Sequence, residues 1–440
     1  MKKVINSVAF IFLKDDKILV EKRKSSKRID PNKICIPSGG IEKGETPEEA
    51  LIRECKEELG ISVKDYFFIT SIIYKHIEVD FKLTYFVVAK WIEKIKKLEA
   101  DKLLWIDKNS LEELDLEVDK KAIKKMNILI QKKELKSILL NYNIGKYLSH
   151  KHISQALENT VYFVKTTKGK YILKIFEDVK EKEILNQTRV QEYLSKKGNF
   201  VPKIVRDKKG RDIFYYKKKP IQIQEFVEGK RVKLSNSLIK QYGNVIGKID
   251  SDLRKLKLKP FYPWGTEFEF KPMKIYSGKK LSLKKEHLKL LKEIKKLNKK
   301  KLSKSVVHGD LNLENTLVHK GKINAIIDFG DSHTGFTVTD PMIFICDEII
   351  TQKSLNYKKI NLFLKEYEKQ IKLSEEDKKA LFLFAKLRCI YSMNWCNHMT
   401  KKHGKENKRI KNLFKEYYCK YELLSNTRTQ DFLGNVFVIG

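Results

Sequence analysis

Apolar runs that end at polar turns predict strands in the first 130 residues of the chain. The first two runs flank a turn at Asp15 and Asp16, so we expect them to pair. Between the run that ends at residue 20 and the run that begins at residue 66, residues 46–60 place apolar side chains at helical spacing and predict a helix. Thr46 and Glu49 predict a capping box at the beginning of this helix. The four runs are residues 4–13, 18–20, 66–74 and 81–88.

A second β-rich segment begins near residue 160, and helices fill the last third of the chain. Residues 161–164 and 171–176 flank a polar turn and predict a hairpin, and residues 323–327 predict a buried strand. From 343 to 424, apolar and aromatic side chains recur at the spacing of helices that form a core. At about 150 residues per domain, a chain of 440 residues suggests two or three domains. The expected fold class is therefore α/β, with more than one domain.

The charge balance is strongly basic. The 92 Lys and Arg residues outnumber the 56 Asp and Glu residues and give a formal net charge of +36, which suggests a polyanionic partner. Only 11 of the basic residues are arginines, however, and Arg is favoured for recognition of phosphates and bases. Lysines spread over the predicted helices indicate solvated helix faces, so a nucleic-acid partner is not expected.

Cysteine spacing and hydropathy bear on the cellular compartment. The six cysteines include no C-x-x-C pair and no cluster with the spacing of zinc ligands. We therefore expect reduced thiols in a cytoplasmic protein. No uninterrupted apolar stretch reaches the roughly 18 residues that a membrane span needs, so no membrane partner is expected.

The predicted helix 46–60 carries a cluster of carboxylates. Glu54, Glu57 and Glu58 lie at positions i, i+3 and i+4, which places them on one face. They should repel one another unless a cation lies between them. Mg²⁺ prefers oxygen ligands and is often shared between carboxylates and substrate phosphates. A solvated acidic face that pairs with lysines is the alternative interpretation.

The complete pattern around this helix resembles the signature of the Nudix hydrolases. The resemblance implies an α/β/α sandwich over residues 1–130, in which the helix and the loop before it hold a divalent metal, Mg²⁺ or Mn²⁺, against a diphosphate. It also implies that water attacks phosphorus, and the metal would supply charge neutralisation and activate that water. The matching positions are Gly39, Glu45, Arg53, Glu54, Glu57, Glu58, Gly60 and Ile61.

The same resemblance implies roles for single residues of the signature. Arg53 and Glu45 would support the loop and the helix, and Glu57 would belong to the catalytic set as well as to the metal shell. The implied metal ligands are Glu54, Glu57, Glu58 and the Gly39 carbonyl.

Two further positions resemble MutT-type members of that family. Glu99 lies six residues before Trp105, as a glutamate does in those enzymes, and is a candidate metal ligand or general base, with a plain loop residue as the alternative. Asp119 resembles the position at which a polar side chain contacts a nucleobase, with a helix N-cap as the alternative. The implied substrate is a nucleoside triphosphate or a compound linked to a nucleoside diphosphate.

A second set of motif residues lies within residues 306–332. The triplet H-G-D ends at Asp310, Asn315 follows five residues later, and the triplet D-F-G begins at Asp328 after a buried strand. This is the spacing of the catalytic loop and the metal-binding segment of kinases. Asp310 would accept or orient the proton of a substrate hydroxyl, and Asn315 and Asp328 would hold Mg²⁺ on the phosphates of the donor nucleotide. An incidental loop rich in Asp and Asn is the alternative.

The form of this motif indicates the class of acceptor. Gly309 replaces the arginine of protein kinases and no A-P-E segment follows, so protein substrates are not expected. The pattern H-G-D-x-x-x-x-N resembles instead the aminoglycoside phosphotransferase and choline kinase superfamily, and residues 153–176 resemble its homoserine kinase type. The resemblance implies a bilobal protein-kinase-like fold. Its expected parts are a helical linker or start of the kinase domain at 131–150, a β-rich N-lobe at 151–229 and a helical C-lobe at 230–440.

The resemblance also implies the nucleotide contacts. Lys174 would bind the phosphates of ATP or GTP, or else extend from a strand edge into solvent, and the backbone from Glu225 to Val227 would read the base. The glutamate expected to pair with this lysine falls at Gln187, which leaves Glu183 one turn earlier as its substitute. Four acids could meet an amine on the acceptor, or else be helix caps and surface acids: Asp331, Asp340, Asp347 and Glu348.

Together these patterns predict a bifunctional enzyme. Its N-terminal part would be a Mg²⁺-dependent hydrolase, and its C-terminal part would phosphorylate the hydroxyl of a small molecule such as an amino alcohol or a hydroxy amino acid. One alternative is an antibiotic phosphotransferase of the aminoglycoside type. The other is a regulatory protein that binds nucleotide or RNA and has one inactive domain.

Overall fold

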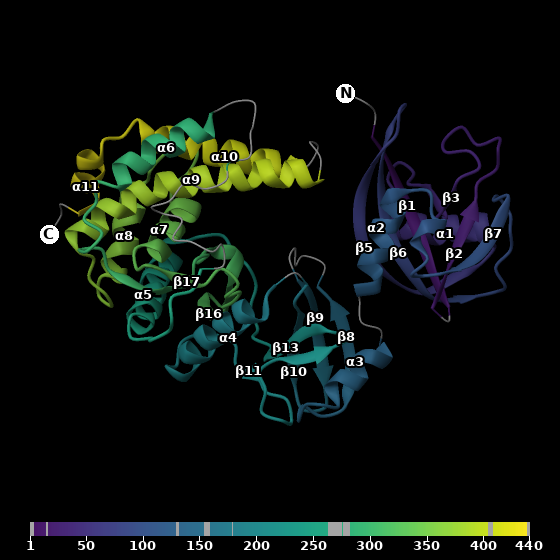
Figure 1. Ribbon diagram of the computed structural model, residues 1–440, viewed down its shortest axis with the longest axis horizontal. Coiled ribbons are helices and arrows are strands. Elements are labelled where there is room, and N and C mark those ends of the chain that lie inside the picture. The colour runs from purple at the N-terminus through teal and green to yellow at the C-terminus, as the bar shows by residue number, and fades with distance from the viewer. Residues whose placement is uncertain are drawn as a thin grey trace. The chain divides into compact units, whose positions relative to one another are not determined.

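The computed structural model describes residues 4–14, 16–128, 132–153, 159–177, 179–262, 275, 282–403 and 408–437. The chain forms two compact units, residues 1–169 with 173–177 and residues 170–172 with 178–440. Figure 1 shows the helices and strands of each unit.

A seven-stranded mixed sheet forms the centre of the N-terminal part (Figure 1). Its order is β3-β2-β1-β6-β5, with β4 paired to β1 and β7 paired to β2. β1 runs parallel to β6, whereas β5 and β6 are antiparallel. The strands are β1 (Val4–Lys14), β2 (Lys17–Lys22), β3 (Ile34–Cys35), β4 (Ser38–Gly40), β5 (Ser62–Lys75), β6 (Asp80–Ile92) and β7 (Lys102–Asp107).

Helices cover both faces of this sheet. Successive side chains of a strand point to opposite faces. Ile11 of β1 therefore enters one core with residues of α2 (Glu117–Ile128), and Phe12 enters another with residues of α1 (Pro47–Leu59). The result is the predicted α/β/α sandwich, with α1 packed on one face.

The capping box predicted for α1 is present. The Thr46 hydroxyl accepts the N–H of Glu49 at 3.2 Å, and the Glu49 carboxylate accepts the N–H of Thr46 at 2.8 Å. Gly60 ends the helix in the left-handed conformation, with φ of +67°. These local interactions fix the ends of the helix and so the position of its acidic face.

The segment expected to be a helical linker contains a helix and a strand. α3 (Lys132–Leu139) is helical, as predicted, but β8 (Tyr147–His152) pairs antiparallel with β9 (Thr160–Thr166). The expectation of helix up to residue 150 is therefore wrong for its last residues. Pairing with β9 provides hydrogen-bond partners for the backbone of these residues. The local pattern of apolar and polar residues does not reveal a partner strand elsewhere in the chain.

A six-stranded sheet contains the hairpin predicted near residue 160. Its order is β11-β13-β10-β9-β8, with β12 paired to β13. α4 (Glu181–Lys196) follows the hairpin strand β10. The remaining strands are β10 (Lys170–Ile175), β11 (Ile204–Val205), β12 (Phe214–Tyr216) and β13 (Lys219–Glu225).

The C-terminal part is helical and has one large core. Phe382 and Phe384 are buried in it, whereas Tyr391 and Trp395 of the same helix are only partly buried. Two α-helices approach closely at Gly243, where a Cβ atom would lie 2.3 Å from the Phe363 carbonyl oxygen. The helices are α5 (Asn236–Leu253), α6 (Leu283–Ile294), α7 (Thr339–Phe344), α8 (Tyr357–Tyr367), α9 (Glu375–His403), α10 (Lys408–Ser425) and α11 (Thr429–Phe437), with a π-helical turn at Ile345–Ile349.

Two short antiparallel pairs support the predicted kinase loops. β14 (Lys304–Val307) pairs with β17 (His333–Phe336), and β15 (Thr316–His319) pairs with β16 (Lys322–Ile326). Val307 is the register partner of His333. The beginning of the loop that contains Asp310 therefore lies beside the end of the loop that contains Asp328.

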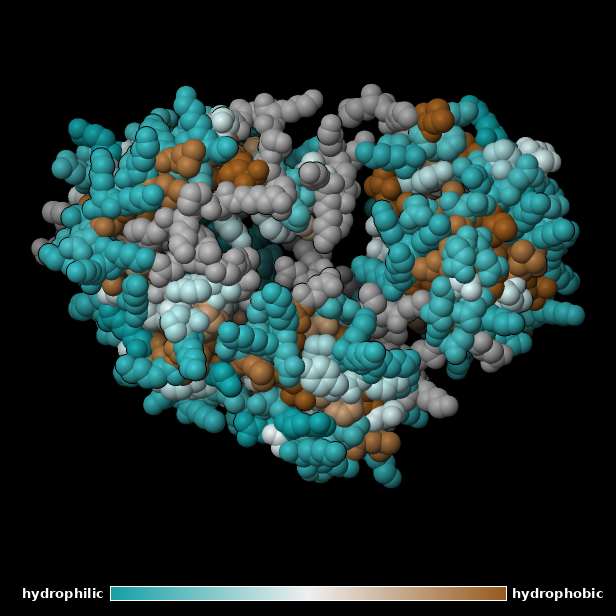
Figure 2. Space-filling model, viewed as in Figure 1, coloured by the Kyte–Doolittle hydropathy of each residue, from teal (hydrophilic) through white to brown (hydrophobic). Residues whose placement is uncertain are grey.

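Surface and helix properties agree with the composition. Figure 2 shows that hydrophilic residues dominate this face of the molecule. In the part of the chain that the structure describes, no helix has both the length and the apolar character needed to cross a membrane. The six cysteines are free thiols, and five of them are buried.

Candidate active sites

Arg53 organises the acidic face of α1. Its guanidinium donates hydrogen bonds to both carboxylate oxygens of Glu45, at 3.0 and 2.9 Å, and to the Gly40 carbonyl at 2.8 Å. It also donates to Glu54 at 2.9 Å and to Glu57 at 3.0 Å. The hydrogen bond from Arg53 lowers the pKa of Glu45. Arg53 and Glu45 thus connect the loop to the helix, in the supporting position that the resemblance implied.

Glu58 lies on the buried side of the same helix face. Its Oε2 atom is buried and has no hydrogen-bond partner among the described residues. Burial, together with the charges of Glu21 and Glu54, raises the pKa of Glu58 to about 9. Burial also raises the pKa of Glu54. A divalent cation would give the unpartnered oxygen a partner and relieve the repulsion, so this all-oxygen donor set fits Mg²⁺.

Gly39 allows the backbone of β4 to approach these carboxylates. A Cβ atom at this position would lie 1.9 Å from Cδ of Glu54, so a larger residue would displace the Glu54 carboxylate. Two of the predicted ligands, Gly39 and Glu54, are therefore brought together. Among the described residues, no three Asp, Glu, His or Cys side chains form a metal-binding group. Arg53 pairs with Glu54 and Glu57 in this arrangement.

Glu99, the candidate base, lies at the edge of the same site. Its side chain is exposed and forms an ion pair with Lys27 at 2.9 Å. Its charge contributes to the raised pKa of both Glu54 and Glu58. Glu99 is therefore close enough to the predicted ligands to influence them electrostatically.

Asp119 is a buried residue of α2. Its carboxylate accepts the N–H of Ile36 at 2.9 Å and the hydroxyl of Tyr85 at 2.6 Å. Burial raises the pKa of Asp119 to about 7. The N-cap interpretation does not fit, because Asp119 is the third residue of α2 and binds groups outside the helix. Its role in reading a base stays a prediction.

Glu21 of β2 is an acidic residue of this region that the sequence analysis missed. The side chain is buried, forms an ion pair with Arg23 at 3.4 Å, and burial raises the pKa of Glu21. Its charge also contributes to the raised pKa of Glu58. The available signal was a glutamate that directly follows the apolar run 18–20.

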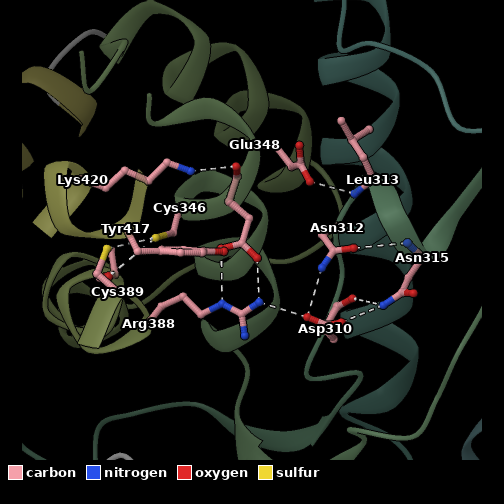
Figure 3. Close-up of polar contacts among 12 residues, drawn as sticks. Asp310, Asn312, Leu313, Asn315, Cys346, Glu348, Arg388, Cys389, Tyr417 and Lys420 are labelled. Atoms are coloured by element: carbon pink, nitrogen blue, oxygen red, sulfur yellow. Dashed lines mark hydrogen bonds and ion pairs between the residues drawn. The ribbon is translucent and has the colours of Figure 1, made fainter. Parts of the chain in front are cut away.

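Asp310 is surrounded by hydrogen-bond donors in the C-terminal part (Figure 3). Its Oδ1 accepts from Asn312 Nδ2 and from Arg388 Nη2, both at 3.0 Å. Its Oδ2 accepts from Asn315 Nδ2 at 2.8 Å. A carboxylate has about four acceptor positions, so Oδ2 retains one for a substrate hydroxyl. The predicted pair Asp310 and Asn315 is thus in direct contact.

Asp340 anchors the loop that carries Asp310. It is fully buried, and its two oxygens accept the backbone N–H groups of His308 and Gly309, each at 2.8 Å. Gly309 has φ of +83°, and a Cβ atom there would lie 2.3 Å from the Asp331 carbonyl oxygen. The suggestion that Asp340 meets an acceptor amine is therefore wrong, because both of its oxygens hold the loop.

The loop that contains Asp328 contacts the Asp310 loop through His308. The His308 ring lies 4.7 Å from the Phe329 ring between centroids, and its Nε2 lies 3.2 Å from the Ile327 carbonyl oxygen. Asp328 has φ of +64°, a conformation that is uncommon outside glycine. Both motif loops are therefore braced against each other through His308.

Arg388 of α9 is the second functional candidate that sequence reasoning missed. Asp347 holds its guanidinium through two contacts, Oδ1 to Nε at 3.2 Å and Oδ2 to Nη2 at 2.6 Å. The Tyr417 hydroxyl donates to Asp347 Oδ1 at 2.8 Å. Arg388 lies 78 residues from Asp310 in sequence. Its only sequence signal was an arginine in a chain whose basic residues are mostly lysine.

Glu348 lies next to this ion pair and contacts the catalytic loop. It accepts the N–H of Leu313 at 2.9 Å. Burial, and after it the charge of Asp347, raises the pKa of Glu348 to about 7, against the opposing effect of the Leu313 hydrogen bond. Asp347 and Glu348 are thus bound to protein groups rather than presented as surface acids.

The predicted nucleotide-binding residues lie on the six-stranded sheet and on α4. Lys174 is part of β10, with its Nζ 5.2 Å from the centre of the Phe176 ring. Glu183 lies in the first turn of α4, and Glu225 is the last residue of β13, two residues before Val227. The N–H of Glu225 donates to the Lys203 carbonyl at 2.8 Å. Their roles toward a nucleotide stay predictions.

Comparison with known proteins gives two family matches. Residues 3–126 match the NUDIX domain, and residues 149–356 match the phosphotransferase enzyme family. The 8-oxo-dGTP diphosphatase of Escherichia coli (strain K12) is 32% identical over 91 residues, which are 21% of this chain and 70% of that protein. A homoserine kinase of Neisseria meningitidis serogroup B is 27% identical over 252 residues, 55% of this chain and 81% of that protein.

A solved structure shows the same fold in the C-terminal part. It is the amicoumacin kinase hAmiN in complex with AMP-PNP, Ca²⁺ and Ami, with a TM-score of 0.53 and 19% sequence identity. The match covers 70% of this chain and 96% of that one. Together with the family matches, it confirms the predicted fold class, an α/β/α sandwich followed by a kinase-like fold.

Proposed function

The chain belongs to the Nudix family through residues 3–126, and residues 149–356 form a domain of the phosphotransferase enzyme family; from this premise we propose a bifunctional enzyme. One half hydrolyses a diphosphate bond of a nucleotide, and the other transfers a phosphoryl group to the hydroxyl of a small molecule. The observation that carries the kinase half is the free acceptor position on Asp310 Oδ2, beside Asn315.

In the hydrolase half, the residues that would hold Mg²⁺, or Mn²⁺, are Glu54, Glu57, Glu58 and the Gly39 carbonyl. Bound metal supplies charge neutralisation and an activated water. Arg53 keeps the loop and the helix at a fixed separation. Glu99 is the proposed general base, and attack of water on phosphorus breaks the P–O–P bond and releases two phosphate products. The exposed side chain of Glu99 supports this role because solvent can reach it.

We propose a nucleoside triphosphate as the substrate class of the hydrolase half. The similarity to an 8-oxo-dGTP diphosphatase over 70% of that protein supports this class. Asp119 would contact the base. Because burial raises the pKa of Asp119 to about 7, its carboxyl group can be protonated near neutral pH and could then donate a hydrogen bond as well as accept one.

In the kinase half, Asp310 orients the acceptor hydroxyl and takes its proton. The hydroxyl oxygen attacks the γ-phosphorus of ATP or GTP, and the bond to the β,γ-bridging oxygen breaks. Asn315 uses its Nδ2 on Asp310, so its Oδ1 remains available for Mg²⁺ together with Asp328. Lys174 and Glu183 would position the donor phosphates, and the backbone from Glu225 to Val227 would bind the base.

We propose that the acceptor is a hydroxy amino acid or an amino alcohol. Similarity to homoserine kinases over 81% of one such protein supports the first of these. The test compares product formation by the wild type, Asp310→Asn and Glu57→Gln with Mg²⁺. Asp310→Asn should abolish acceptor-dependent ADP formation and leave diphosphate hydrolysis, and Glu57→Gln should do the reverse. Loss of both activities in either variant would contradict two separate active sites.

A further inference from the structure

The guanidinium of Arg388 has a nitrogen with unused donors beside the proposed catalytic carboxylate. Nε and Nη2 place their three N–H groups on Asp347 and Asp310. Nη1 makes no hydrogen bond to any residue that the structure describes. In Figure 3 this nitrogen points away from the Asp310 carboxylate. The side chain is 17% exposed, so a small ligand can reach it.

The position of Arg388 is fixed rather than adjustable. Asp347 binds two of its nitrogens, and the Tyr417 hydroxyl binds Asp347. Lys420 donates to the Asp347 carbonyl oxygen at 3.0 Å (Figure 3). A guanidinium held in this way loses little conformational entropy when its remaining donors bind a ligand.

Three of the four acids considered for an acceptor amine bind protein groups. Asp347 Oδ1 accepts two hydrogen bonds and its Oδ2 accepts one, all from protein groups. Glu348 accepts the N–H of Leu313, and Asp340 holds the catalytic loop. Arg388 is the cationic group that contacts Asp310 directly, and its Nη1 makes no hydrogen bond to a described residue.

The two groups that a substrate would meet are close together. Asp310 Oδ2 keeps an acceptor position for the hydroxyl, and Arg388 Nη1 keeps two donors. Their side chains are joined by a hydrogen bond of 3.0 Å between Oδ1 and Nη2. A molecule with only a few bonds between its hydroxyl and an anionic group can therefore reach both.

We propose that Arg388 selects acceptors that carry a carboxylate as well as the phosphorylated hydroxyl. The proposal rests on the kinase function above and narrows its acceptor to hydroxy acids, including hydroxy amino acids, in preference to amino alcohols and aminoglycosides. A guanidinium presents N–H groups in a plane that suits a carboxylate, and such charge-assisted hydrogen bonds are strong.

The first test uses the wild-type full chain with ATP and Mg²⁺ and compares matched acceptors. L-Homoserine is compared with 3-amino-1-propanol, which lacks only the carboxylate, and with 4-hydroxybutyrate, which lacks only the amine. We expect kcat/KM to fall about 100-fold or more without the carboxylate, because the two Nη1 donors then have no partner on the substrate. Loss of the amine should cost less than loss of the carboxylate.

The second test asks whether Arg388 causes this preference. In the double variant Arg388→Gln with Asp347→Asn, the paired charges are removed together, so that no buried carboxylate is left alone. The ratio of kcat/KM between L-homoserine and 3-amino-1-propanol should fall to below about 5. Lys379→Gln, on the exposed side of the same helix, should keep the wild-type ratio. Unchanged thermal unfolding of the C-terminal part verifies that each variant is folded.

The outcomes separate the inference from the function on which it rests. If the wild type uses 3-amino-1-propanol or choline as well as L-homoserine, the kinase function stands and the role of Arg388 is wrong. The role of Arg388 is also wrong if the folded double variant keeps the wild-type ratio of kcat/KM between L-homoserine and 3-amino-1-propanol. If no hydroxyl compound in the panel is phosphorylated, the proposed kinase function and this inference both fall.

Discussion

The backbone conformation of the catalytic loop requires glycine at position 309. Its φ of +83° and the 2.3 Å approach of a Cβ atom to the Asp331 carbonyl oxygen exclude other residues. We expect Gly309→Ala to lower kinase kcat about 100-fold, because a displaced loop moves Asp310 out of line. Gly321→Ala is the matched control, since Gly321 has φ of +76° but no atom within 4 Å of its Cβ position. Equal kinase activity in the two variants would contradict the steric argument.

The buried carboxyl group of Asp119 makes the stability of the N-terminal part depend on pH. Burial raises its pKa from 3.8 to about 7, so the folded state binds a proton that the unfolded state releases in this range. The protonated Asp119 therefore stabilises the folded state most below the pKa of the unfolded state, 3.8. This stabilisation is lost as the pH rises through the pKa of the folded state, about 7. We expect a loss of about 2–3 kcal/mol between pH 5 and pH 8 relative to Asp119→Asn. Urea unfolding of both proteins at the two pH values measures the difference, and parallel pH profiles would argue against a shifted Asp119.

At the scale of elements, α1 depends on interactions at its ends. The Thr46 hydroxyl accepts the N–H of Glu49. Thr46→Ala should destabilise the N-terminal part by about 1 kcal/mol. Ser110→Ala is the control, because Ser110 precedes a short 3₁₀ helix (Leu111–Glu113) without capping it. Urea unfolding tests both variants, and an equal effect of the two would show that the capping box contributes little.

Elements whose signals are local could be predicted from the sequence. α1 and the two kinase loops are each a continuous segment, so the spacing of their motif residues and the caps of α1 can be recognised in the sequence. β8 was missed because its strand character depends on pairing with β9. Glu21 and Arg388 were missed for a related reason, since each reaches its site only through the packing of a strand or helix distant in sequence from the motif.

For the whole molecule, the separation of the N-terminal cores from the C-terminal core predicts two unfolding transitions. The sandwich has a core on each face of its sheet, and the C-terminal helices share another core. AMP-PNP with Mg²⁺ at 100 times its Kd should stabilise the C-terminal transition by about 2.7 kcal/mol. Calorimetry should show this shift in Glu57→Gln and not in Asp328→Asn. A single transition that shifts in both variants would indicate one cooperative unit.

The sequence by itself determined the two families, the two chemistries and most of the proposed ligands, because each motif is a contiguous segment whose spacing follows from helix and loop geometry. Only the tertiary structure decided what surrounds those residues. It assigned Asp340 to the catalytic loop, paired Asp347 with Arg388, and left Arg388 Nη1 with donors beside Asp310. These relations join residues that are 31 to 78 positions apart, and burial and the sharing of lone pairs between such residues arise only when the chain is folded.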